Sequence, residues 1–416
     1  MTKIIVRGGK QLRGEVKIKG AKNSVLPLFA AAVLTQEEVT VHNVPELSDV
    51  KNMLRILDEI GAETFFENGT AKIRAKNICK NEIPVSLARV LRSSFFLLGS
   101  VLSRTGGAKV AYPGGCDIGL RPIDLHIKAL RDLGVLIEEV SGYVVCDNAR
   151  QSAGEVVLDY PSVGATENVI LSSVLTPGTT VLHNAACEPE IVDLQRLLNK
   201  MGASVSGAGT PVIKVVGVDS LHGAEHTAIP DRIAAGTYAL AAAITGGEIT
   251  LLGADPTDMR ALLSKLAKTS CIISQSGDII RIKGRERTKA VDLLTTRPHP
   301  GFPTDLQAHM MALMTVSEGT SVFCEKIFEN RFRHVGELIK MGANITVDGR
   351  TAVVTGVPRL HGAEVEAQDL RGGAALVLAG LNARGETTIC NVEHIDRGYE
   401  RIEEVFSDLG ADIRRV

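Results

Sequence analysis

One short segment recurs along the whole chain, and this repetition limits the possible folds more than any other feature. The first copy is Gly61-Ala62-Glu63, which follows an amphipathic helical pattern. The related segments are residues 134–135, 202–204, 342–344 and 410–412, with a degenerate copy near 268–270. The spacing is roughly 70 residues, so six copies fill the 416-residue chain. We therefore expect six structurally equivalent units.

Each unit is expected to contain the same elements in the same order. Residues 26–34 are apolar on nearly all sides, which predicts a fully buried helix. A strand is expected at residues 39–41, and residues 50–57 have the spacing of an amphipathic outer helix. Glu67-Asn68-Gly69-Thr70 has the residues of a hairpin turn between two further strands. The later units have strand patterns at residues 109–111, 180–182, 248–250, 321–323 and 388–390.

A buried helix needs more cover than one such unit can provide. Three units around a common axis would enclose three helices within a shell of sheets, and six units would make two such globes. A solenoid is the alternative, but solenoid repeats are usually shorter, and a buried central helix favours closure. The sequence therefore predicts an α/β protein with two globes of three repeated strand-helix-strand-helix-strand units.

Composition excludes several classes of function. The formal net charge of −2 provides no field that would attract nucleic acid or an anionic membrane. No apolar run approaches the length of a membrane span, and residues 1–9 lead into a strand pattern without a signal-peptide core. The seven cysteines are scattered without metal-ligand spacing, which favours reduced thiols. We expect a cytoplasmic protein with no metal and no organic cofactor; nothing in the sequence indicates its oligomeric state.

Polar residues interrupt the apolar pattern at the starts of the buried helices. These starts are residues 20–24, 91–94, 162–166, 230–232, 303–305 and 369–371. A second polar set precedes the outer helices, at residues 114–124, 188–190, 330–331 and 396–397. If all units share one direction, both sets of helix N-termini lie at one end of each globe, where they favour anions. Two globes that met at these ends would form a cationic cleft.

The alternative is that these polar residues only cap helices. Capping does not explain a cation such as Lys22 or Arg397, because a positive charge at a helix N-terminus opposes the dipole. Asp231–Arg232 and Asp369–Arg371 are either internal pairs or ligand sites, and both readings stay open. Lys22 has no carboxylate adjacent in sequence, so we expect it to bind an anionic ligand.

The segment around Cys116 is the most irregular of the chain. Pro113-Gly114-Gly115 precedes the cysteine and predicts an exposed loop, where a thiol is available for chemistry. Arg121 would favour the thiolate and Asp117 would oppose it, but a thiol can donate a proton and a thiolate can attack an electrophile. Asp305, at the start of another buried helix, is the best candidate for a general base, with a simple helix cap as the alternative.

Several of these segments together resemble one enzyme family, from end to end and in the same order. The segments are Gly20-Ala21-Lys22-Asn23, Pro113-Gly114-Gly115-Cys116, residues 121–126, residues 162–166, Phe302-Pro303-Thr304-Asp305 and residues 396–401. They are similar to those of the UDP-N-acetylglucosamine 1-carboxyvinyltransferases, which are enolpyruvyl transferases. The resemblance implies transfer of enolpyruvate from phosphoenolpyruvate to the 3'-hydroxyl of UDP-N-acetylglucosamine, with release of phosphate, at the first committed step of peptidoglycan synthesis.

The resemblance also implies the fold and the domain boundaries. The family has two inside-out α/β barrel globes of three repeats each, and its N-terminal strand joins the second globe. The expected domains are residues 22–229, with the cysteine loop, and residues 1–21 plus 230–416, with Asp305 and Arg397.

Residue roles come from the same resemblance. Cys116 would protonate the methylene carbon of phosphoenolpyruvate, and Asp305 would deprotonate the attacking hydroxyl; Lys22 and Arg397 complete the catalytic set. The residues that would hold phosphoenolpyruvate are Lys22, Asn23, Arg121, Arg371 and Arg397. Those that would line the sugar nucleotide are Asn23, Arg92, Arg121, Pro122, Ile123, Asp124, Leu125, Ser162, Val163, Gly164, Asp305 and Ile327.

Two other functions stay open. One is the sister transferase that makes 5-enolpyruvylshikimate-3-phosphate, which shares the repeats but does not use a loop cysteine as the acid. The other is a catalytically silent paralogue that acts as a binding partner. Such a paralogue would be expected to lose Lys22, Cys116, Asp305 or Arg397, and all four are present.

Overall fold

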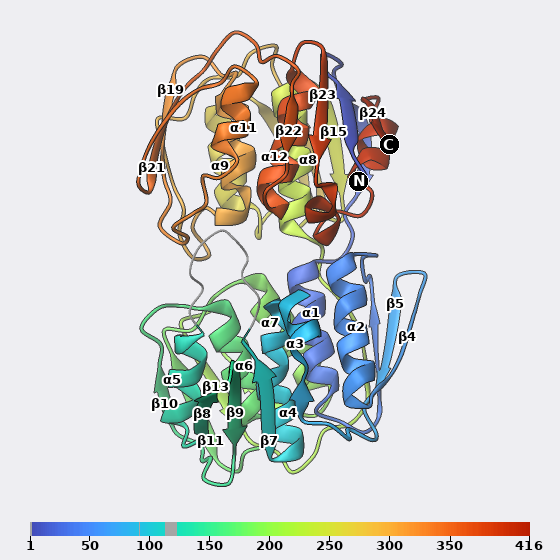
Figure 1. Cartoon of the computed structure of the whole chain (residues 1–416), viewed down its shortest axis with the longest axis vertical. Helices are drawn as coiled ribbons and strands as arrows, with labels where there is room; N and C mark the ends of the chain where they lie inside the picture. The colour runs from blue at the N-terminus through green and yellow to red at the C-terminus, as the bar shows by residue number, and fades with distance from the viewer. Residues whose placement is uncertain (1, 91, 113–122) are drawn as a thin grey trace. The chain divides into compact units, whose positions relative to one another are not determined.

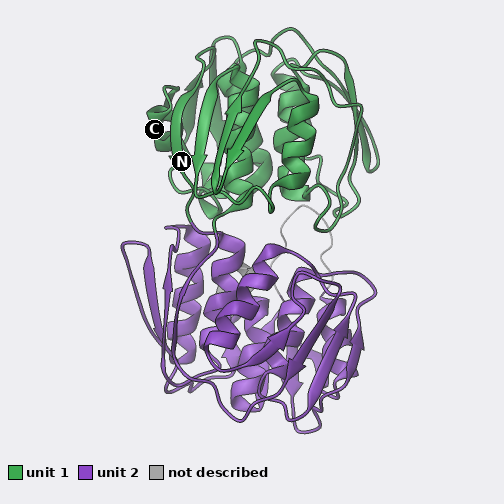
Figure 2. Cartoon of the chain, turned by 180° about the vertical axis from the view of Figure 1, so that it is seen from behind, with its two compact units in different colours: residues 1–19, 116–120, 230–416 green, residues 20–115, 121–229 purple. Residues whose placement is uncertain are grey.

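The computed structural model describes residues 2–90, 92–112 and 123–416. Contacts divide the chain into two compact units, which Figure 2 shows in different colours. Within the described residues, unit 1 consists of residues 2–19 and 230–416, and unit 2 of residues 20–112 and 123–229. Each unit has its own apolar core and three four-stranded sheets.

Unit 2 contains the first three repeats (Figure 1). Its strands are β3 (Glu38–His42), β4 (Glu63–Glu67), β5 (Thr70–Arg74), β6 (Glu82–Ile83), β7 (Gly107–Ala111), β8 (Leu136–Val140), β9 (Tyr143–Asp147), β10 (Glu155–Val157), β11 (Thr179–His183), β12 (Ser204–Ser206), β13 (Val212–Val216) and β14 (Ala224–Thr227). Its helices are α1 (Lys22–Ala32), α2 (Ser48–Ile60), α3 (Val85–Val90), the 3₁₀ turn η1 (Arg92–Phe96), α4 (Leu97–Thr105), α5 (Asp124–Asp132), α6 (Val163–Ser173) and α7 (Pro189–Lys200).

Unit 1 contains the other three repeats and the N-terminal strands. Its strands are β1 (Ile4–Arg7), β2 (Arg13–Lys17), β15 (Glu248–Leu252), β16 (Ile272–Ser276), β17 (Ile279–Lys283), β18 (Leu293–Thr295), β19 (Thr320–Cys324), β20 (Asn344–Asp348), β21 (Thr351–Thr355), β22 (Glu364–Glu366), β23 (Glu386–Cys390) and β24 (Asp412–Arg415). Its helices are α8 (Arg232–Thr245), α9 (Arg260–Lys268), the 3₁₀ turn η2 (Thr304–Leu306), α10 (Gln307–Met314), α11 (Val335–Lys340), α12 (Leu370–Asn382), the 3₁₀ turn η3 (Val392–Arg397) and α13 (Ile402–Asp408).

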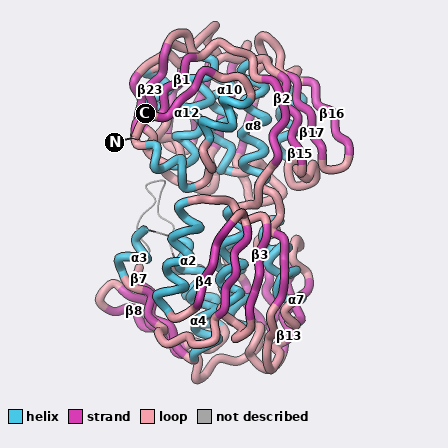
Figure 3. The backbone as a smooth tube through the Cα atoms, turned by 90° about the vertical axis from the view of Figure 1, so that its right-hand side faces the viewer, coloured by secondary structure: helices cyan, strands magenta, loops and turns pink. Residues whose placement is uncertain are grey.

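All six sheets of the described chain share one pairing pattern. Figure 3 shows the strands of the sheet β2-β15-β17-β16 side by side. In this sheet the first pair of strands is parallel and the next two pairs are antiparallel. The sheet β22-β23-β1-β24 has the same pattern, with β1 between the two strands nearest the C-terminus. The N-terminal strand therefore belongs to unit 1.

The predicted buried helices are the central helices of the two units. Helices α8, α10 and α12 contact one another in unit 1, and α1, α4 and α6 do so in unit 2. All eight residues of α10 are buried, as expected for a helix that is apolar on every side. Small residues allow the close approach: a Cβ added at Gly99 of α4 would lie 2.6 Å from the backbone oxygen of Asn168 in α6. The fold class predicted from the repeats, with two globes of three units, is confirmed.

The recurring glycines end the outer helices in a left-handed conformation. Gly61, Gly202 and Gly410 have φ values of 105°, 97° and 95°. The degenerate copy keeps this conformation without glycine, because Ser270 has φ 70°. The predicted hairpin turn is also confirmed, since Asn68 and Gly69 both have positive φ between β4 and β5.

The second repeat differs from the expectation at its helix start. Its central helix does not begin directly at the polar residues near position 92, because η1 (Arg92–Phe96) precedes α4 as a 3₁₀ turn. The first central helix also ends earlier than the apolar run suggested, at Ala32, with a turn at Val33 and Leu34.

The Ser270 conformation leads to a reciprocal stability prediction. Ser270→Gly should raise the free energy of unfolding of unit 1 by about 0.5–1 kcal/mol, because glycine carries no Cβ penalty at positive φ. Gly410→Ser, at the equivalent turn of the same unit, should lower it by about 1 kcal/mol. An added Cβ at Gly410 meets no atom within 4 Å, so this change tests conformation alone. Urea unfolding of both variants measures the two effects; equal signs would contradict the explanation.

Candidate functional site

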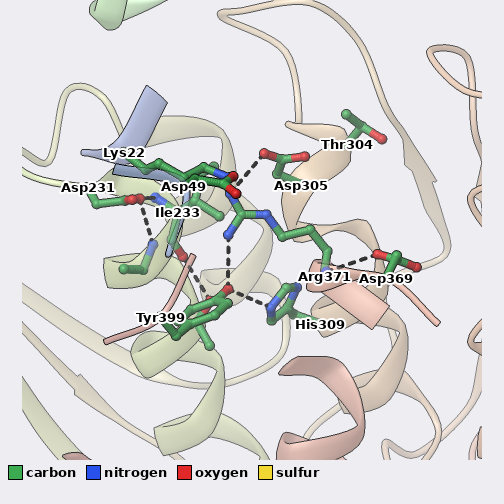
Figure 4. Close-up of polar contacts among 12 residues, drawn as sticks. Lys22, Asp49, Asp231, Ile233, Thr304, Asp305, His309, Asp369, Arg371 and Tyr399 are labelled. Atoms are coloured by element: carbon green, nitrogen blue, oxygen red, sulfur yellow. Dashed lines mark hydrogen bonds and ion pairs between the residues drawn. The ribbon is translucent and has the colours of Figure 1, made fainter. Parts of the chain in front are cut away.

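Asp305, whose side chain is 25% exposed, pairs with two buried arginines in unit 1. Its carboxylate accepts a hydrogen bond from Nη2 of Arg331 at 2.8 Å and one from Nη2 of Arg371 at 3.1 Å. Figure 4 shows the Arg371 pair. The Arg331 side chain is only 3% exposed and also donates to the backbone oxygen of Thr304. Neither η2 nor α10 has a side-chain cap, so Asp305 is an ion-pair partner rather than the simple cap of the alternative reading.

Arg371 belongs to this network although it lies at the start of α12, where its charge opposes the helix dipole. Its guanidinium pairs with Asp305, whereas Asp369 caps the helix by accepting from the backbone N–H groups of Arg371 and Gly372. Burial by itself would lower the pKa of Arg371, but the nearby Asp305 charge, Tyr399 and Asp231 together raise it. Asp305 therefore supplies the offsetting anion, and Asp369 acts as a cap.

Two histidines lie under this network, and both are buried. The pKa of His309 is well below its ordinary value, first because of burial and then because of the charges of Arg371 and Arg331. Burial is also the largest cause that lowers the pKa of His334 to about 4; the Arg331 charge acts with it, while Asp369 opposes it. Both rings are therefore neutral at neutral pH.

Lys22, in the first turn of α1 in unit 2, has a carboxylate partner. Its Nζ lies 3.1 Å from Oδ2 of Asp49, and both side chains are nearly buried. Lys22 has no carboxylate adjacent in sequence, but the fold supplies one, because Asp49 comes from the first turn of α2. This pair offsets the opposed helix dipole. Binding of an anionic ligand by Lys22 stays a prediction. Asn23 follows Lys22 and is half-buried.

The segment 162–164 forms the start of α6 in unit 2. Ser162 is a cap, because its side chain accepts from the backbone N–H of Ala165 at 3.4 Å. Gly164 leaves no room for a side chain: an added Cβ would lie 2.8 Å from Cε1 of His126 and 3.1 Å from Phe96. Nδ1 of His126 in turn lies 2.8 Å from the amide nitrogen of buried Asn168. This packing holds the backbone of residues 163–164 close to α5.

Glu167, one turn further along α6, is a buried acid that the sequence analysis did not identify. Both carboxyl oxygens lack a hydrogen-bond partner within the described residues. Its pKa is well above the ordinary value because of burial, with smaller effects of Glu190 and Glu188. The neutral acid is therefore the favoured form.

The other predicted positions are spread over both units. Ile123 precedes α5 and is buried, Asp124 is its first residue and is exposed, and Leu125 is half-buried. The backbone N–H of Ile327 donates to Oε1 of Glu325 at 2.8 Å. Arg397 is the last residue of η3. Cys116, Arg121 and Pro122, and the side chain of Arg92, lie outside the described residues.

Three partners of the predicted residues could not be recognised from local sequence patterns: Arg331, Asp49 and Tyr399. The sequence places Arg331 in a polar segment before an outer helix, and no role was predicted for it although it has the same repeat position as Arg397. Asp49 and Tyr399 received no role. An alignment of the repeats would have pointed to Asp49, because α2, α5 and α7 each have an acidic residue in the first turn.

The described residues contain no group of side chains placed to bind a metal ion and no helix that could span a membrane. No three His, Cys, Asp or Glu side chains of residues 2–90, 92–112 and 123–416 are placed to hold a metal ion. None of the helices in this part of the chain is long and apolar enough to cross a membrane.

Comparisons with known proteins relate the whole chain to enolpyruvyl transferases. The family model of EPSP synthase (3-phosphoshikimate 1-carboxyvinyltransferase) matches residues 6–406. UDP-N-acetylglucosamine 1-carboxyvinyltransferase 2 of Caldanaerobacter subterraneus subsp. tengcongensis is 50% identical over 416 residues, which is 100% of both chains. UDP-N-acetylglucosamine 1-carboxyvinyltransferase of Magnetococcus marinus is 49% identical over 418 residues, again over 100% of both chains.

Solved structures share the fold. The enolpyruvyl transferase NikO of Streptomyces tendae matches with a TM-score of 0.89 and 26% identity, covering 100% of this chain and 99% of that one. EPSP synthase of Acinetobacter baumannii matches with a TM-score of 0.77 over the same shares of the two chains. Its identity is 19%, so this likeness concerns the fold alone.

The lowered pKa of His334 predicts a specific loss of stability in acid. The folded state holds the ring neutral down to about pH 4, whereas the unfolded chain protonates it near 6.5. Stability is therefore complete above about pH 6.5 and falls by up to ~3 kcal/mol as the pH drops toward 4. His334→Asn, which does not titrate, should reduce this slope by about one proton. Urea unfolding at pH 7, 6 and 5 measures the slopes; parallel curves would contradict the assignment.

Proposed function

Because the chain belongs to the family of UDP-N-acetylglucosamine 1-carboxyvinyltransferases, we propose that it transfers enolpyruvate from phosphoenolpyruvate to the 3'-hydroxyl of UDP-N-acetylglucosamine and releases phosphate. The observation that carries this proposal is a sequence identity of 50% and 49% to two relatives of that name, over 100% of each pair of chains. The reaction is the first committed step of peptidoglycan synthesis, so we infer that the protein works in the cytoplasm on small-molecule substrates.

Asp305 is proposed as the general base. The reaction needs an oxygen nucleophile at one carbon of phosphoenolpyruvate and a proton at the next. Arg331 and Arg371 each form an ion pair with the Asp305 carboxylate, a group that can accept a proton from a hydroxyl. They also fix its direction, because each guanidinium bonds a different carboxylate oxygen. Asp305 would take the proton of the 3'-hydroxyl as the oxygen attacks.

Cys116 is proposed as the acid that protonates the methylene carbon. Loss of phosphate together with a proton from that carbon would then restore the double bond in the product. Lys22 and Arg397 would hold the phosphate and carboxylate of phosphoenolpyruvate, with Asn23, Arg121 and Arg371 as further contacts. Lys22 is held in place by Asp49, whose charge also offsets its cation before substrate binds. No step needs a metal or an organic cofactor.

The sugar nucleotide is assigned to residues that the family pattern supplies. They are Asn23, Arg92, Arg121, Pro122, Ile123, Asp124, Leu125, Ser162, Val163, Gly164, Asp305 and Ile327. The start of α6 supports this proposal, because helix N-termini attract phosphate and Gly164 places no side chain in the first turn. The names of the relatives with about 50% sequence identity do not support the alternative acceptor, shikimate-3-phosphate.

Phosphate release from phosphoenolpyruvate tests the reaction and its acceptor. We expect release with UDP-N-acetylglucosamine and none with shikimate-3-phosphate. Release with shikimate-3-phosphate instead would change the acceptor and keep the family. Absence of release with both acceptors would overturn the proposed reaction and favour the silent paralogue, which direct binding of the two substrates would then examine.

Cys116→Ser should lower kcat by about 100-fold or more, since a serine hydroxyl is a much weaker acid than a thiol. Its unfolding temperature should stay at the wild-type value. Cys79→Ser is the matched control, because Cys79 is an exposed free thiol, and this variant should keep wild-type kcat. Wild-type turnover in Cys116→Ser would remove Cys116 from the acid role.

A further inference from the structure

One hydroxyl group contacts all three central helices of unit 1. The side-chain oxygen of Tyr399 lies 2.8 Å from Oγ1 of Thr237 in α8, 3.0 Å from Nε2 of His309 in α10 and 3.3 Å from Nη1 of Arg371 in α12. Figure 4 shows the contacts to His309 and Arg371. Tyr399 is only 2% exposed. Its contacts all fall in the first two turns of these helices, next to the network of Asp305.

The protons of this cluster can be assigned. Arg371 can only donate, and the hydroxyl of Thr237 donates to the backbone oxygen of Ile233 at 2.9 Å. The single proton of the Tyr399 hydroxyl therefore goes to Thr237. His309 is neutral, and placing its proton on Nε2 lets it donate to Tyr399, which leaves Nδ1 as a bare acceptor without a partner among the described residues. A bare acceptor costs less than a buried, unpaired N–H.

The Tyr399 oxygen thus accepts from Arg371 and His309 and donates to Thr237, which uses its full capacity. The three partners come from three different repeats, so the hydroxyl fixes the helix starts relative to one another. Arg371 is shared with Asp305, since its Nη1 bonds Tyr399 and its Nη2 bonds the carboxylate. The position of Asp305 therefore depends on where Tyr399 holds the guanidinium.

We propose that Tyr399 is a positioning residue for the reaction: through Arg371 it sets the direction of the Asp305 carboxylate toward the hydroxyl that Asp305 deprotonates. This inference rests on the proposed function and adds a residue that acts through Arg371 and Asp305. The competing explanation is that Tyr399 only stabilises the core of unit 1. The two explanations differ in whether the effect of Tyr399 passes through Arg371.

A double-mutant cycle separates the two explanations. Tyr399→Phe removes only the hydroxyl and should lower kcat about tenfold, with less than about a twofold change in KM for UDP-N-acetylglucosamine. In an Arg371→Lys background, which already loses the two-pronged contact, Tyr399→Phe should lower kcat by less than about twofold. Independent tenfold losses in both backgrounds, or wild-type kcat in Tyr399→Phe, would overturn the proposal.

Thr237→Val provides a milder change in case Tyr399→Phe fails to fold. It removes the group that receives the Tyr399 proton and should lower kcat about threefold. Thr315→Val is its matched control, because the Thr315 hydroxyl is equally buried and, within the described residues, donates to the oxygen of Ala312 in the preceding turn at 2.6 Å. Thr315→Val should lower the unfolding temperature about as much as Thr237→Val does, but it should keep the wild-type kcat. Equal kcat in the two valine variants would contradict a role for Tyr399 in positioning.

Failure of this inference is distinguishable from failure of the proposed function. An active wild-type protein with an additive cycle would remove Tyr399 from the mechanism and leave the reaction intact. A wild-type protein that releases no phosphate with UDP-N-acetylglucosamine would overturn the reaction, and the positioning role with it. The same cycle measured on thermal unfolding reports the contact between Tyr399 and Arg371 without any activity, and additive unfolding effects would show that the contact is absent.

Discussion

The whole structure depends on the burial of helices that have no polar face. Such a helix is stable in water only if other elements cover it on every side. Each unit solves this problem by packing three of them around one axis and closing three sheets over them. The sheets have one apolar face toward the helices, which explains their alternating burial, as in β17. Repetition follows from this requirement, because one repeat alone cannot cover its helix.

The same arrangement explains why charges are tolerated so deep in unit 1. An isolated buried ion is costly, but Arg331 and Arg371 lie with Asp305 and Asp369 in a set whose formal charges cancel. The buried histidines add no charge, because burial keeps them neutral. In unit 2 the Lys22–Asp49 pair is a smaller case of the same balance. A carboxylate that is held this rigidly suits directed proton transfer better than a mobile surface acid.

The sequence predicted what is local or repeated. The hairpin at residues 67–70, the central helices and the number of repeats followed from spacing and turn residues. The missed features are contacts between residues that are far apart in sequence: Asp49 is 27 residues from Lys22, and Tyr399 is 162 residues from Thr237. Local patterns cannot show which of many polar residues will meet after closure. They also could not decide whether Asp305 caps a helix, which depended on two arginines far along the chain. The roles of Cys116 and of the substrate contacts stay predictions.

The place of β1 has a consequence for synthesis on the ribosome. This strand is among the first segments to emerge, but it pairs with β23 and β24, which are among the last. All three sheets of unit 2 are built from residues 38–227, so their strands find partners long before β1 does. During that interval the edges of Ile4–Arg7 are unpaired, and three of its four residues are apolar. The order of translation therefore leaves an early segment exposed to chaperones and to misassembly until the last strand has been made.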